Sequence, residues 1–73
     1  MLFGKTKKIV EDKEAELKLN LSNNYKDAAY KSFQEFISII KDLRNDGKIS
    51  DKDFEKLSSR VEEYKRKFRN YIN

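Results

Sequence analysis

The spacing of apolar residues in the last third of the chain determines the secondary structure of that segment. Six apolar side chains recur there at alternating spacings of three and four residues: Phe54, Leu57, Val61, Tyr64, Phe68 and Tyr71. At about 100° per residue they fall within about a third of a helix circumference, whereas a strand period of two would send them to both faces. The pattern predicts an amphipathic helix over residues 51–72, with a narrow seam typical of antiparallel helix packing.

Two clusters of turn-forming residues interrupt the rest of the chain. They are LSNN at residues 21–24 and RNDGKIS at residues 44–50, in a sequence without proline whose only glycines are Gly4 and Gly47. Strong helix formers fill the segments between them. We therefore expect an all-α fold with three helices in one small domain spanning the chain.

The middle segment is predicted to be a helix with a wide apolar face. It covers about residues 25–46, begins at Asn24 as the N-cap, and forms an antiparallel helical hairpin with residues 51–72. About half of its circumference is apolar. The side chains concerned are Ala28, Ala29, Tyr30, Phe33, Phe36, Ile37, Ile39, Ile40 and Leu43. One neighbouring helix cannot cover so wide a face, so this helix must contact at least two others or a partner chain.

The N-terminal segment permits two interpretations. Phe3, Val10, Leu17 and Leu21 share one helical face, with Leu19 on the opposite side. The stretch LKLNL alternates with a period of two and is also compatible with a short strand. A strand without a partner leaves its backbone groups unsatisfied, and no second strand is indicated, so we expect an additional N-terminal helix.

The stretch RNDGKISDKDFEKL, residues 44–57, permits a calcium loop or a helical corner. In the calcium-loop template Gly47 takes the central glycine position. Arg44 then stands at the third position, where an oxygen ligand is needed, and Asp53 replaces the bidentate glutamate of the twelfth. A cation at a ligand position opposes calcium, so we expect no metal site here.

A helical corner accounts for more of these residues. Gly47 suits the left-handed conformation that ends a helix. Ser50 is predicted as the N-cap of the last helix, with Asp53 at its N3 position, as in a capping box. Ile49 and Phe54 flank the cap as a hydrophobic staple. The stretch therefore predicts the hairpin corner.

The same stretch resembles a known family, the short C-terminal (SHOCT) domain of bacterial proteins. The resemblance covers residues 43–57, with an aspartate at position 53 where glutamate is usual and a longer final helix. It implies a helical hairpin in a bacterial or phage accessory module that serves assembly rather than catalysis. The residues that carry it are Leu43, Gly47, Ile49, Ser50, Asp53, Phe54 and Leu57.

The composition argues against catalysis. The 73 residues include no cysteine and no histidine, so disulfides, thiolate metal sites and the commonest general base are missing. The 13 carboxylates remain, but a short helical domain offers no deep pocket to raise their pKa values. We expect a protein that is not an enzyme, with no cofactor and no small-molecule substrate.

No stretch has the length of a signal peptide's apolar core or of a membrane span, so we expect a cytoplasmic protein. The N-terminal MLFGKTKKIV offers a weaker alternative, a segment lying on an anionic membrane. We do not expect membrane association, because such a stretch is more often a frayed start of the chain or a helix that covers the core.

The favoured function is binding to protein. A chain of this size buries only about 60% of its unfolded surface, so a partner or a homodimer would complete a thin core. Tyr30, Ile37 and Ile39 lie towards the edges of the wide apolar face and are the predicted contacts. The alternative is a complete monomer in which the first helix covers this face.

A second functional class is a small nucleic-acid-binding protein. The chain has 17 basic and 13 acidic residues, a net charge of +4. Four cations near the C-terminus would contact phosphates, with binding that falls as salt rises: Lys65, Arg66, Lys67 and Arg69. Cations at this position also complement a helix dipole without any ligand.

Overall fold

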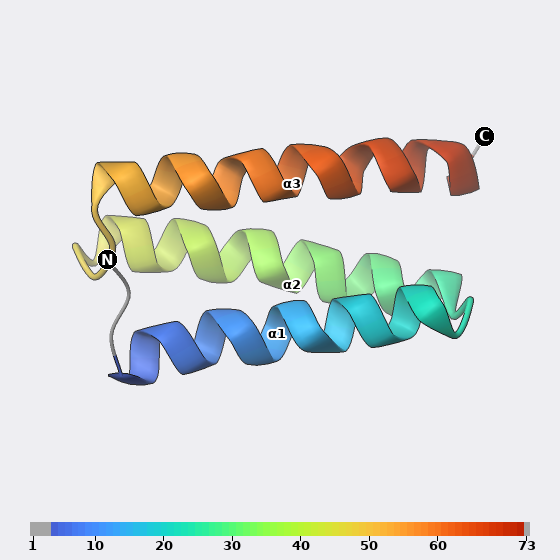
Figure 1. Cartoon of the computed structure of the whole chain (residues 1–73), viewed down its shortest axis with the longest axis horizontal. Coiled ribbons are helices and arrows are strands. Elements are labelled where there is room, and N and C mark those ends of the chain that lie inside the picture. The colour runs from blue at the N-terminus through green and yellow to red at the C-terminus, as the bar shows by residue number, and fades with distance from the viewer. Residues whose placement is uncertain (1–3, 73) are drawn as a thin grey trace.

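The structure, a computed structural model, describes residues 4–72, and side chains within residues 4–69. Its elements are α1 (Gly4–Ser22), α2 (Lys26–Asn45) and α3 (Asp51–Ile72), joined by two short turns (Figure 1). The all-α expectation is confirmed, and the hairpin helices lie within one residue of their predicted bounds. The LKLNL stretch is helical. Phe3 and the side chain of Tyr71 lie outside the described residues.

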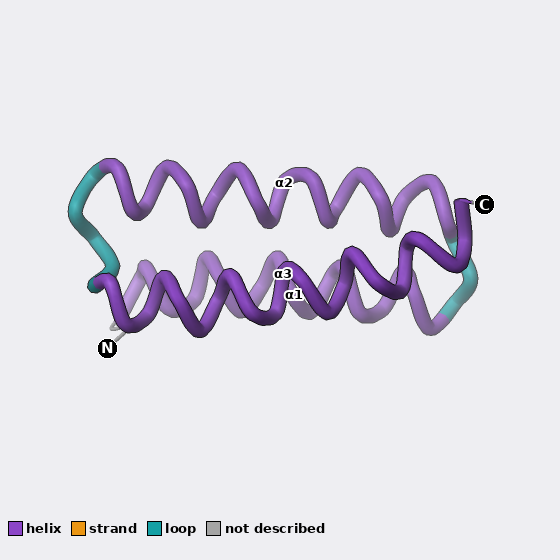
Figure 2. The backbone as a smooth tube through the Cα atoms, turned by 90° about the horizontal axis from the view of Figure 1, so that it is seen from above, coloured by secondary structure: helices purple, strands orange, loops and turns teal. Residues whose placement is uncertain are grey.

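The three helices run up, down and up along the length of the molecule. Figure 1 shows α2 between α1 and α3, and Figure 2, seen from above, shows α2 on one side with α1 and α3 together on the other. The two views describe a triangle of helices. The longest dimension, 35 Å, matches the roughly 33 Å expected for a helix of the length of α3, so every helix spans most of the molecule.

The core follows the helical faces that the sequence predicted. Val10 and Leu17 of α1 are fully buried, as is Phe36 of α2. Leu19, on the opposite side of α1, is 61% exposed. The prediction that α2 must contact two helices is confirmed, because it packs against both α1 and α3.

The first turn corrects one expectation, because Asn24 is not the N-cap of α2. The N-cap is Tyr25, which makes no side-chain capping hydrogen bond. Asn24 instead has a φ of 60° and terminates α1. Its N–H donates to the Leu21 carbonyl at 3.2 Å, and the Tyr25 N–H donates to the Asn20 carbonyl at 2.9 Å. In so short a turn the left-handed residue required by α1 takes the position that a cap of α2 would need.

The second turn has the same hydrogen-bond pattern with the predicted glycine. Gly47 has a φ of 70°, and its N–H donates to the Arg44 carbonyl at 3.1 Å. The Lys48 N–H donates to the Leu43 carbonyl at 2.9 Å. These two bonds form a Schellman motif, so the helix-ending role predicted for Gly47 is confirmed.

The start of α3 also follows the predicted corner. The Asp53 N–H donates to Ser50 Oγ at 3.1 Å, which makes Ser50 the N-cap. Ile49 is buried and Phe54 packs against the core cluster. Arg44 forms an ion pair with Asp51, and its guanidinium lies 5.8 Å from the Phe54 ring centroid. Arg44, which occupies the third position of the calcium template, therefore stabilises the corner between α2 and α3 through these contacts.

Candidate functional site

The side of α2 that faces α1 combines small residues with polar contacts. Ser32 is buried and accepts a hydrogen bond from Asn20 Nδ2 at 3.1 Å, while its hydroxyl donates to the Glu16 carboxylate. Ala29, one turn earlier on the same face, is fully buried. Small side chains at a helix contact allow the two backbones to approach closely.

Ion pairs extend this contact. Lys13 Nζ lies 3.0 Å from Glu35 of α2 and 3.1 Å from Glu16 of its own helix. The hydrogen bond from Ser32 lowers the pKa of Glu16, and Lys13 lowers it further. The hydrogen bond to Glu35 raises the pKa of Lys13. The α1–α2 contact is thus fixed by paired polar groups as well as by apolar burial.

The side of α2 that faces α3 is aromatic. The rings of Phe33 and Phe68 stack with centroids 5.0 Å apart, and Tyr30 lies edge-on to Phe68 at 5.5 Å. Deeper in the core, Phe36 meets Tyr64 edge-on at 6.2 Å. Rings of this size keep α2 and α3 further apart than the small residues on the other side of α2 keep α1.

A hollow surface follows the seam between α2 and α3. It consists of two hollows of about 430 Å³ and 270 Å³ that share Ile37 and Lys65. We call the pair the α2–α3 groove. The first hollow is lined by Tyr30, Phe33, Gln34, Ile37, Lys65, Phe68 and Arg69. The second is lined by Ile37, Ile40, Lys41, Phe54, Ser58, Val61, Glu62 and Lys65.

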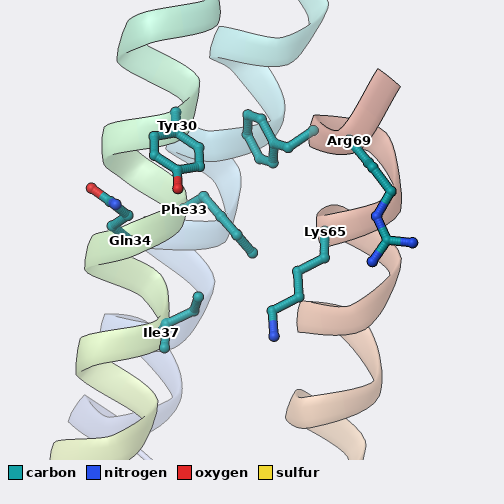
Figure 3. Close-up of a pocket in the computed structure, with 7 residues that line it drawn as sticks. Tyr30, Phe33, Gln34, Ile37, Lys65 and Arg69 are labelled. Carbon is teal, nitrogen blue, oxygen red and sulfur yellow. The ribbon is translucent and has the colours of Figure 1, made fainter. Parts of the chain in front are cut away.

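The groove has an apolar floor and a cationic rim. In Figure 3, Ile37 from α2 and Lys65 from α3 extend towards each other across the first hollow, with Arg69 one turn beyond Lys65. Lys41 lies on the α2 wall of the second hollow. Glu62 is the acidic residue among the lining side chains, and it forms an exposed ion pair with Lys65 at 3.5 Å. The rim therefore carries more positive than negative charge.

The structure divides the predicted protein contacts. Tyr30, 40% exposed, and the partly buried Ile37 both line the groove. Ile39 is partly buried against the core and does not line it. It lies one turn after Glu35, which contacts α1, so Ile39 lies on the α1 side of α2.

The structure also divides the C-terminal cations. Lys65 and Arg69 line the groove beside Tyr30 and Ile37, so residues from both predicted functional sets meet there. Lys67 lies on another face, with its Nζ 5.7 Å from the Tyr64 ring centroid. Arg66 is exposed and lines neither the α2–α3 groove nor the hollow beside Tyr64 that Lys67 lines. The four cations therefore point in different directions around α3.

A buried carboxylate joins α1 to α3. Glu14 is only 8% exposed and accepts hydrogen bonds from the Tyr64 hydroxyl at 2.9 Å and from Arg60 Nη1 at 3.0 Å. Burial, together with this hydrogen bond, raises the pKa of Tyr64. With Lys18, Glu63 and Lys67, these three residues line a polar hollow of about 300 Å³. Because the charges of Glu14 and Arg60 are paired with each other, we interpret these residues as a structural link between α1 and α3 and not as a binding site.

The sequence interpretation missed Glu14 and Lys41. Glu14 lies on the apolar face of α1, four residues after Val10 and three before Leu17, and a charged residue at such a position indicates a buried partner. Lys41 lies one turn after Ile37 and so shares its face. Both signals are visible in the sequence, but the residues they meet on other helices are not.

Comparison with protein-family models, curated proteins and solved structures found no match to this chain. Within residues 4–72, no helix has both the length and the apolar character needed to cross a membrane. Among the same residues, the acidic side chains form no group of three or more suited to hold a metal ion.

Proposed function

We propose that this protein is a non-catalytic protein-interaction module whose α2–α3 groove receives the partner. The observation that carries the proposal is the groove itself, because an apolar floor continuous with the core lies open beneath a cationic rim. Binding surfaces typically combine an apolar centre with a polar rim. Tyr30 supplies the kind of exposed aromatic anchor that is enriched where partners bind most strongly.

The original expectation about the apolar face of α2 is narrowed by this geometry. The α1 side of that face is filled by Val10, Leu17 and the polar contacts of Ser32. What stays open is the strip from Tyr30 through Ile37 to Lys41, together with the α3 residues opposite. The proposed binding surface is therefore the groove and not the whole face.

Site-specific photo-cross-linking tests this proposal. A photoreactive phenylalanine analogue replaces Tyr30 in the groove or, as the matched control, Leu19 on the outer face of α1, which is 61% exposed. In extracts of the native host we expect a discrete cross-linked protein from position 30 and not from position 19. Adding Ile37→Glu to the position-30 protein should remove the product. Equal products from both positions, or none above background, would contradict the proposal.

Nucleic-acid binding is tested in parallel. The four C-terminal cations point in different directions around α3, which does not favour one phosphate-tracking surface. We therefore expect no binding to a nonspecific DNA duplex even at about 50 mM salt. Binding at that salt that weakens by about a hundredfold or more near 200 mM, as four phosphate contacts would require, would instead favour the nucleic-acid alternative.

A further inference from the structure

We propose that the occupant of the α2–α3 groove is an amphipathic helix with acidic residues on both sides of its apolar stripe, which completes a four-helix bundle. This inference rests on the proposed function and specifies the partner. It is carried by the shape of the groove, the chemistry of its floor and the distribution of charge on its rim.

The shape of the groove fits a helix. Its walls are two antiparallel helices, and a helix laid over such a seam packs as the fourth member of a bundle. The α2 wall from Tyr30 to Lys41 is about 16 Å long at 1.5 Å per residue, which corresponds to about three turns of a partner helix. Residues 4–72 form helices and turns, so this part of the chain offers no strand edge for an extended peptide to join.

The floor calls for a continuous apolar stripe on the partner. At one end it is aromatic, with Phe33 and Phe68 stacked and Tyr30 beside them. Towards the corner it becomes largely aliphatic, with Ile37, Ile40 and Val61 beside the ring of Phe54. Apolar residues at the first, fourth or fifth, eighth and eleventh positions of a helix would lie along this floor in one line.

The rim selects acidic flanks. Lys65 and Arg69 stand one turn apart on the α3 wall, and Lys41 stands on the α2 wall. Among the described side chains, Lys41 and Arg69 make no ion pair. The pair of Lys65 with Glu62 is exposed and so contributes little stability that binding would have to replace. A partner with acids on both flanks meets opposite charges, whereas one with basic flanks meets like charges.

The same charges argue against a second copy of this chain as the occupant. A twofold dimer through the groove would place the rims of the two copies against each other, because a twofold interface uses the same patch on both subunits. Two rims that each carry more positive than negative charge, from Lys41, Lys65 and Arg69, would then lie against each other. We expect the protein to be a monomer in light scattering over a range of concentrations, and a dimer that Ile37→Glu dissociates would overturn the inference.

A peptide panel tests the inference directly. The probes are labelled helical peptides of about 15 residues with leucine, isoleucine or phenylalanine stripes and glutamate flanks. Each has a basic twin with lysine in place of glutamate, and a scrambled acidic peptide without a stripe. By fluorescence anisotropy we expect an acidic striped peptide to bind at least about tenfold more tightly than its basic twin and than the scrambled peptide. Raising the salt from about 50 to about 500 mM should narrow the difference between the twins.

Charge reversal on the protein provides the matched control. In Lys65→Glu/Arg69→Glu the ranking of the twins should invert, because the α3 wall then favours basic flanks. Lys52→Glu/Arg66→Glu makes the same change of charge at exposed positions outside the groove and should leave the ranking unchanged. Circular dichroism checks that both variants are folded.

The outcomes separate this inference from the proposed function. If no acidic peptide binds, if the twins bind equally, or if both double variants behave alike, the inference is wrong. If position 30 still cross-links a host protein in a manner that depends on Ile37, the proposed function stands with a different class of partner. If cross-linking fails as well, both are wrong.

Discussion

The two contacts of α2 differ in chemistry, although both belong to one bundle. Towards α1, α2 presents the small residues Ala29 and Ser32, and hydrogen bonds and ion pairs fix the register. Towards α3, it presents the rings of Tyr30, which lies edge-on to Phe68, and Phe33, which stacks on Phe68. The first contact brings the two backbones closer together, and the second has a groove along its outer side.

The difference shows how the size of the side chains between two helices determines whether a groove forms beside them. The distance between packed helices depends on the residues at their contact, so small residues bring the axes together and large rings separate them. On the α1 side the backbones approach each other more closely. On the α3 side the rings fill the centre of the contact but not its margin, so apolar side chains such as Ile37 stay partly open to solvent.

The largest expected effect comes from comparing core truncations at the two contacts. Leu17→Ala, at a fully buried site of α1, should lower the free energy of unfolding by about 2–5 kcal/mol. For a chain of this size, that is a large part of a total of roughly 4–11 kcal/mol. Ile37→Ala, in the groove, should lower it by less than about 1.5 kcal/mol, because part of its side chain is already exposed. Urea unfolding followed by circular dichroism at 222 nm measures both losses, with Leu19→Ala as the exposed control. Equal losses for Leu17→Ala and Ile37→Ala would show that Ile37 is packed as tightly as Leu17, and would contradict an open groove.

A smaller effect is expected at the bridge between α1 and α3. Glu14→Ala leaves the buried Tyr64 hydroxyl without its acceptor and should lower the free energy of unfolding by about 1–3 kcal/mol. In the Tyr64→Phe background the same substitution should cost less, because the hydroxyl that it orphans is gone. A double-mutant cycle by urea unfolding measures this coupling, and additive losses would mean that the two residues act independently.

The two turns offer the next comparison, because both end a helix with a left-handed residue. Gly47→Ala should lower the free energy of unfolding by about 1–2 kcal/mol, through backbone strain alone. Apart from Gly47 and its two neighbours in the chain, no residue has an atom within 4 Å of an added Cβ there. Gly47→Asn should lose less, since asparagine occupies the same conformation at position 24. Thermal or urea unfolding ranks the three proteins, and equal losses for alanine and asparagine would contradict this account.

Acid should weaken the α1–α2 contact. The pKa of Glu16 is lowered in the folded state by the hydrogen bond from Ser32 and by Lys13. The resulting stabilisation is present above the unfolded pKa, about 4.5, and is lost as the pH falls through the folded value. We expect the free energy of unfolding to fall less steeply between about pH 5 and pH 3 in Ser32→Ala than in the wild type. Parallel acid slopes would show that Glu16 contributes nothing to that dependence.

The smallest effect on stability is expected on the rim of the groove. Lys41 is exposed and makes no ion pair among the described side chains, so Lys41→Ala should change the free energy of unfolding by less than about 0.5 kcal/mol. The same substitution should weaken binding of an acidic striped peptide. A loss of stability comparable to that of Ile37→Ala would place Lys41 in the packing of the α2–α3 contact.

Much of the fold was predictable because its signals are local. The spacing of Phe54, Leu57 and Val61 needs only the helix period, and the conformation of Gly47 needs only its missing Cβ. The prediction of Asn24 as a cap was wrong because two helices compete for one turn residue, and the end of α1 prevailed. The candidate site was predicted in part: Tyr30, Ile37, Lys65 and Arg69 were named in two separate sets, and only the fold places them around one groove.

By itself, the sequence determined where the second and third helices begin and end to within one residue and which of their faces are apolar, and it favoured a helix before them, since these properties depend on residues within a few turns of each other. Only the tertiary structure decided how the wide face of α2 is shared. That division depends on which side chains meet across helices, as when Ser32 meets Asn20 on one side and Phe33 meets Phe68 on the other. The size of the side chains at each contact set the distance between the helices, and that distance left the groove open.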